Sequence, residues 1–116
     1  MFRYIKQYLE QNGINETITI GSIVDGDGVG LFSTTGLEPT FYFDDTTIEY
    51  IGLQIISRNK SYHKGEQVIK DIFSLLNKLE GYKPQQSPFS IGKDEKGRSE
   101  FSVNYIISKE GVKKWH

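Results

Sequence analysis

The sequence predicts an α+β fold, a two-layer sandwich in which one mixed sheet of about five strands packs against one long helix. The length of 116 residues is that of a single domain. Several short segments alternate apolar and polar residues, which is typical of half-buried strands. One segment in the second half repeats its apolar residues every three or four positions, which is typical of a helix. The expected order of elements is α-β-β-β-α-β-β.

The N-terminal third predicts a short helix followed by two strands. Apolar residues in 2–12 recur at helical spacing, and Gly13 stands where a left-handed residue would close the helix. Residues 17–20 alternate β-branched side chains, and residues 29–35 are again strand-like. The glycine-rich segment between them is expected to connect the two strands.

The middle of the chain predicts a long surface loop over 36–49, which contains the aromatic patch 41–43 and the acidic pair Asp44 and Asp45. Residues 50–57 follow as a central strand, because their apolar side chains occupy both faces.

The main helix is predicted after Ser61, a residue type that favours the helix N-cap. Its end is expected near Gly81, with Pro84 just beyond. The apolar stripe that defines this helix consists of Val68, Ile69, Ile72, Phe73, Leu75, Leu76 and Leu79.

Two further strands, 88–91 and 100–107, flank the polar turn 92–98 and predict a hairpin. In the second run Phe101, Val103, Tyr105 and Ile107 share one face. We therefore expect a single domain over 1–108 and a C-terminal tail, 109–116, without a clear pattern.

Composition excludes several classes of protein. Hydrophobic residues make up 36% of the chain and charged residues 25%, which favours a folded core over disorder. The chain has no cysteine, so it forms neither a disulfide framework nor a thiolate zinc site. No apolar run approaches the roughly 18 residues of a membrane span, and we expect a soluble intracellular protein without membrane contact.

The formal net charge of −1 conceals two oppositely charged halves. Residues 1–57 carry two cations and eight acids, whereas residues 58–116 carry twelve cations and seven acids. If the halves occupy different faces, copies of the chain would attract one another head to tail. If the halves interleave in one sheet, the charges simply mix.

No catalytic, cofactor or metal motif emerges. The glycines of 25–30 precede a strand and not a helix, which favours a turn over a phosphate loop. A calcium loop beginning at Asp25 would place Gly36 where a bidentate Glu is required. His63 and His116 stand alone and are expected to be solvated surface groups. We expect no enzyme activity and no cofactor.

An RNA-binding interpretation of 96–103 is disfavoured, because Arg98, Ser99 and Glu100 stand where base-stacking aromatics are needed. The low net charge also argues against phosphate binding. Phe101 and Tyr105 are expected in the core. A small nucleic-acid- or ligand-binding module remains the alternative function.

The chain nevertheless resembles a known family. The segments 50–55, Ser61-Tyr62 with the helix ending in Leu75-Leu76, and 87–105 are similar to the small phage minor capsid proteins, which resemble tail terminator or tail completion proteins of long-tailed bacteriophages and prophages. Such proteins often have an additional strand between the long helix and Ser87, where this chain has only residues 80–86.

The resemblance implies a structural protein of the virion, made in the cytoplasm of a bacterial host. Its copies would form a ring, possibly a hexamer, at the end of the tail tube and contact the tube protein and the head-completion or connector protein. From charge and exposure we expect Asp44 and Asp45 to form one contact surface. The opposite surface is expected to comprise Arg58, Lys60, Lys93, Lys96 and Arg98.

Overall fold

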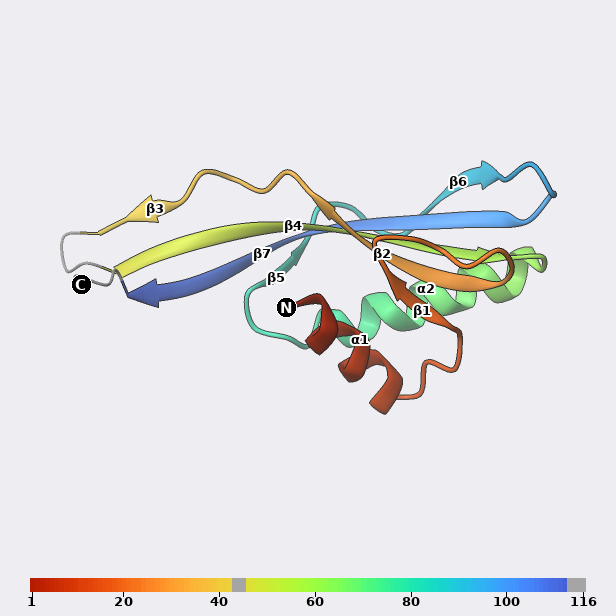
Figure 1. The fold of residues 1–116 in the computed structure, drawn as a ribbon, viewed down its shortest axis with the longest axis horizontal. Helices are drawn as coiled ribbons and strands as arrows, with labels where there is room; N and C mark the ends of the chain where they lie inside the picture. The colour runs from red at the N-terminus through yellow and green to blue at the C-terminus, as the bar shows by residue number, and fades with distance from the viewer. Residues whose placement is uncertain (43–45, 113–116) are drawn as a thin grey trace.

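The computed structural model describes residues 1–42 and 46–112, which form one open sheet with two helices on the same face (Figure 1). This mixed α+β architecture confirms the predicted class. The elements in chain order are α1 (Phe2–Gln11), β1 (Ile18–Ile20), β2 (Gly28–Thr34), β3 (Thr40–Phe41), β4 (Thr46–Asn59), α2 (Tyr62–Leu76), β5 (Tyr82–Pro84), β6 (Phe89–Lys93) and β7 (Ser99–Val112).

The sheet is built around the antiparallel pair β4 and β7. Each strand has 14 residues, and they pair along their whole length from Thr46 opposite Val112 to Asn59 opposite Ser99. At about 3.3 Å per residue such a pair spans about 46 Å, which accounts for most of the 52 Å long axis of the molecule. The strand order is β1-β2-β4-β7-β5, with β3 on β4 and β6 on β7.

The core lies between the helices and one face of the sheet. Side chains at alternate positions of β4 and β7, such as Leu53 and Tyr105, are fully buried on this face. The apolar stripe of α2 packs against them through Ile69, Ile72 and Leu76, which are also inaccessible to solvent. The predicted amphipathic helix and the predicted core positions Phe101 and Tyr105 are therefore confirmed.

The end of α1 and the start of α2 follow the local signals in the sequence, but α2 ends at Leu76 and not near Gly81 as predicted. Gly13 adopts φ +99°, and the amide of Ile14 returns to the carbonyl of Leu9, so α1 closes on a left-handed glycine as expected. The Ser61 hydroxyl accepts a hydrogen bond from the Lys64 amide at 3.3 Å and caps α2.

The sheet has seven strands, whereas about five were expected. The expected loop over 36–49 contains the two-residue strand β3 and the start of β4, which begins four residues before the predicted strand. The short strand β5 occupies the 80–86 segment and pairs with Tyr105–Ile107 of β7. Strands of two or three residues carry no readable alternation, and they form because a long neighbour offers backbone partners.

β4 and β7 also continue beyond the core. The structured chain crosses the predicted boundary at residue 108, because β7 runs to Val112. We call the outer part of this ribbon, Thr46–Tyr50 and Ser108–Val112 together with β3, the arm. In the part of the chain whose burial is described, no arm residue is buried, and the core begins at Gly52 and Ile107. The arm projects from the helix-covered body (Figure 1).

Candidate assembly surfaces

The turn between β6 and β7 is organised by the carboxylate of Asp94. Its Oδ1 accepts hydrogen bonds from the amides of Lys96 (3.1 Å) and Arg98 (2.8 Å). Its Oδ2 accepts from the Arg98 guanidinium at 2.7 Å. The backbone closes the same loop, since the Asp94 amide donates to the Arg98 carbonyl. The turn is therefore held by the carboxylate of Asp94 and by the guanidinium of Arg98, and both side chains are largely shielded from solvent.

Charges from three other segments join this turn. Asp25 lies in the connection between β1 and β2, and its carboxylate contacts Lys96 Nζ at 2.9 Å and Arg98 Nη2 at 3.1 Å. Arg58 near the end of β4 donates to Glu100 of β7 at 2.9 and 3.0 Å. We call Asp25, Arg58, Asp94, Lys96, Arg98 and Glu100 the ionic network.

Three members of the network, Asp25, Asp94 and Arg98, have pKa values shifted toward their charged forms. Hydrogen bonds from Lys96 and then Arg98 lower the pKa of Asp25. Desolvation alone would raise the pKa of Asp94, but hydrogen bonds from Arg98 and Lys96, together with the Arg98 charge, lower it overall. The same hydrogen bond from Arg98 to Asp94 raises the pKa of Arg98 against an opposing contribution from desolvation. The directions of all three shifts favour the ion pairs that these residues form.

The structure therefore separates the basic residues that charge alone had grouped. Arg58, Lys96 and Arg98 are paired within the chain. Lys60 and Lys93 have exposed side chains, and within the described residues no ion partner contacts either of them. Asp44 and Asp45 lie outside the described residues.

Sequence reasoning missed the acidic members of the network. Asp25 and Arg98 are 73 residues apart, and only the sheet brings the connection after β1 close to the hairpin turn. The contact shows that the acidic and basic halves interleave here, as the second of the two sequence-based alternatives expected. The turn signal in 92–98 was visible, but nothing local identified Asp25 as its partner.

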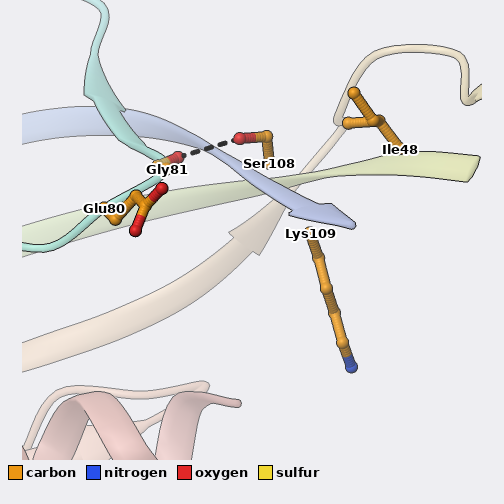
Figure 2. A pocket seen from close by; sticks show the side chains of 5 residues that line it. All are labelled: Ile48, Glu80, Gly81, Ser108 and Lys109. Atoms are coloured by element: carbon orange, nitrogen blue, oxygen red, sulfur yellow. Dashed lines mark hydrogen bonds between the residues drawn. The ribbon is translucent and has the colours of Figure 1, made fainter. Parts of the chain in front are cut away.

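A second surface lies where the arm leaves the body (Figure 2). An open notch of about 470 Å³ is lined by Ile48 of β4, by Ser108 and Lys109 of β7, and by Glu80 and Gly81 before β5. The Gly81 carbonyl receives the Ser108 amide at 2.9 Å, and the side chain of Lys109 extends away from this contact. The notch marks the point at which β5 ceases to cover β7.

Within residues 1–42 and 46–112 no three His, Asp or Glu side chains are grouped to hold a metal ion. His63 is exposed in the first turn of α2, as expected. Among these residues no helix is long and apolar enough to cross a membrane. The first surface presents charged groups, and the second lies beside the edge of a strand.

Comparison with known families defines the class of protein. Residues 8–110, nearly the whole described chain, match the family of bacteriophage tail terminator proteins. The chain belongs to this family and is a structural phage tail protein. No curated protein matches the chain significantly.

Proposed function

We propose that this chain terminates the tail of a long-tailed bacteriophage or prophage. Copies associate into a ring at the end of the finished tail tube, stop its growth and present a surface to the head connector. The observation that carries the proposal is the family match over residues 8–110. The protein acts by binding copies of itself and its neighbours in the virion, without a chemical step.

The shape of the subunit supports an assembly role. A domain of this size has no intramolecular reason to extend two strands beyond its own core, because the exposed outer part gains little burial. Aromatic side chains are exposed on and next to the arm: Phe41 in β3 is 64% exposed, and Tyr42, the residue after β3, is 50% exposed. A partner that covers these side chains would supply the missing burial.

Charge adds a second contact in this proposal. Lys60 and Lys93 have exposed side chains. Arg58, Lys96 and Arg98 form ion pairs within the subunit. We assign Lys60 and Lys93 to a basic contact surface, with Asp44 and Asp45 as acidic contacts on the neighbouring copy. Arg58, Lys96 and Arg98 hold the hairpin that presents Lys93.

The proposal is tested by inactivating the gene in the phage or prophage that encodes this chain. Electron microscopy should then show tails of uncontrolled length that fail to join heads, and a plasmid copy should restore tails of uniform length. Normal tails joined to heads in the absence of the protein would contradict the proposed function.

A further inference from the structure

The connection between β1 and β2 crosses the sheet on the face opposite the helices. The two strands are parallel, with Ile20 level with Leu31, so residues 21–27 must return along the strands before Gly28 begins β2. A parallel crossover usually takes about a dozen residues or more. This connection is therefore short, and it has to run close to the sheet.

Glycines in β2 allow that close approach. Alternate residues of β2 point into the core, so Gly28 and Gly30 face the other side of the sheet. A Cβ atom at Gly30 would lie 2.8 Å from the Ser22 carbonyl oxygen and would collide with the Ile23 side chain. A Cβ atom at Gly28 would lie 3.0 Å from the Val24 side chain. The connection thus rests directly on the backbone of β2.

Few hydrogen bonds fasten the middle of the connection. In the chain as described, 1–42 and 46–112, no amide from 22 to 27 donates a hydrogen bond to another protein group. The Ser22 carbonyl accepts a hydrogen bond from the Thr19 hydroxyl at 2.5 Å. The Val24 carbonyl accepts one from the Arg58 guanidinium at 3.3 Å. The segment therefore lacks the backbone ladder that holds its flanking strands.

Both ends of the connection are anchored, and a glycine lies at or next to each anchor. The Gly21 amide donates to the Leu31 carbonyl at 2.7 Å, and the Asp27 carboxylate accepts the Lys60 amide at 2.9 Å. Gly21 and Gly26 have φ of +79° and +150°, values that glycine adopts more readily than other residues. Backbone rotation at these two glycines moves the residues between them without breaking either anchor.

Asp25 ties the connection to the hairpin turn between β6 and β7. Its carboxylate pairs with Lys96 at 2.9 Å and with Arg98 at 3.1 Å. The side chains of Asp25 and Lys96 are 72% and 65% exposed. Exposed ion pairs contribute little to stability and are screened by salt. This contact can therefore open while the sheet stays intact.

We propose that residues 22–25 form a strap that lifts from the sheet about Gly21 and Gly26 while the body stays folded, with the Asp25 carboxylate as its latch. The structure shows the strap closed. Lifting it breaks the ion pairs of the latch and separates two half-buried side chains from β2, but it leaves both anchors and the β1–β2 pairing in place. The inference concerns the free subunit and does not depend on the proposed function.

An open strap exposes apolar surface of the sheet. Phe32 lies beside Gly30 on this face, and Ile56 of β4 is opposite Gly30 in the register. Both side chains are half-buried while the strap is closed. Salt weakens the latch, because the Debye length falls from about 10 Å at 0.1 M to about 3 Å at 1 M. The strap thus couples the ionic strength around the subunit to the apolar surface that it exposes.

Thiol labelling measures the opening, because the natural chain has no cysteine. The variant Ile23→Cys places its thiol against Gly30 under the closed strap, and an excess of a neutral aromatic disulfide reports how often the thiol becomes accessible. In low salt, adding Asp25→Asn should speed the labelling about two- to fivefold. In salt of about 1 M, Ile23→Cys alone should approach the rate of the double variant. Ile56→Cys repeats the measurement with the strap itself unchanged.

Two controls separate strap opening from other causes. Glu95→Gln removes a carboxylate from the same turn that pairs with no cation among the described residues, and it should leave the labelling of Ile23→Cys unchanged. Val103→Cys reports unfolding of the core and should label slowly with or without Asp25→Asn. Equal labelling of both strap reporters with and without Asp25→Asn in low salt would overturn the proposal. An equal acceleration of Val103→Cys would also overturn it, because the whole body would then be opening.

Discussion

At the residue scale, Asp94 is the group on which the hairpin turn depends. It accepts two amides and the Arg98 guanidinium, and its lowered pKa records that stabilisation. A carboxyl whose pKa is lower in the folded state stabilises the fold above its unfolded pKa, near 3.8, and this contribution is lost as the pH falls through the folded value. Acid should therefore weaken the turn.

Asp94→Asn tests this account. We expect the variant to melt below the natural protein at pH 7, with a difference in Tm that shrinks as the pH falls below 3.8. Thermal unfolding followed by circular dichroism between pH 7 and pH 2.5 measures it. As a control, Glu95→Gln changes an exposed neighbour in the same turn and should leave Tm nearly unchanged. A constant Tm difference over the whole range would contradict the role of the Asp94 charge.

The exposed lysines lead to a different expectation. Lys60→Glu/Lys93→Glu should leave thermal stability close to that of the natural protein, because exposed charges contribute little to folding. The double variant should fail to rescue tail length in the gene-inactivated phage, since it reverses the proposed basic contact. Lys70→Glu/Lys78→Glu, a double reversal on and just after α2, serves as the matched control. Full rescue by Lys60→Glu/Lys93→Glu would remove these two residues from the assembly surface.

At the element scale, the close approach between the end of β2 and the backbone of β4 depends on a glycine. Gly52 faces Thr34 in the β2–β4 register, and a Cβ atom at Gly52 would lie 2.7 Å from the Thr34 carbonyl oxygen and 2.8 Å from that of Thr35. Backbone atoms cannot move aside as a flexible side chain could. We expect Gly52→Ala to lower the free energy of unfolding by about 1–3 kcal/mol.

Denaturant unfolding measures that loss, with the exposed Ser33→Ala on β2 as the control. If Gly52→Ala were as stable as Ser33→Ala, the carbonyls of Thr34 and Thr35 would not approach Gly52 as closely as the structure shows. The apolar pattern predicted the strand that contains Gly52, but the sequence alone could not reveal the carbonyls that face it.

The arm should be the least stable part of the β4–β7 ribbon. Glu49 and Lys109 form a pair of the same type as Leu53 and Tyr105, but only the second pair lies in the core. In the free subunit, amide hydrogen exchange at Glu49 and Lys109 should therefore require a smaller opening free energy than at Leu53 and Tyr105. Equal protection of the two pairs would contradict the description of the arm as an extension without a core.

The elements differ in how well the sequence predicted them. The helix α2 and the β6–β7 hairpin were predicted because their apolar periodicity and turn residues are local signals. β3, β5 and the first residues of β4 were missed, since they form through pairing with distant strands. The predicted basic surface was grouped by charge, but the tertiary contacts of Asp25, Asp94 and Glu100 divide it.

At the scale of the whole molecule, the proposed function would depend on the surfaces of the subunit. The helices and the sheet form a small body, the ionic network fixes one hairpin, and the arm carries an open edge away from the core. The two ends of the sheet differ, which suits a repeating head-to-tail contact better than a two-fold one.

Cryo-electron microscopy of the head-proximal end of the assembled tail tests this central claim most directly. The account predicts a closed ring of copies of this chain on the last layer of the tube. A tail end without this protein, or with a single copy of it, would contradict the claim.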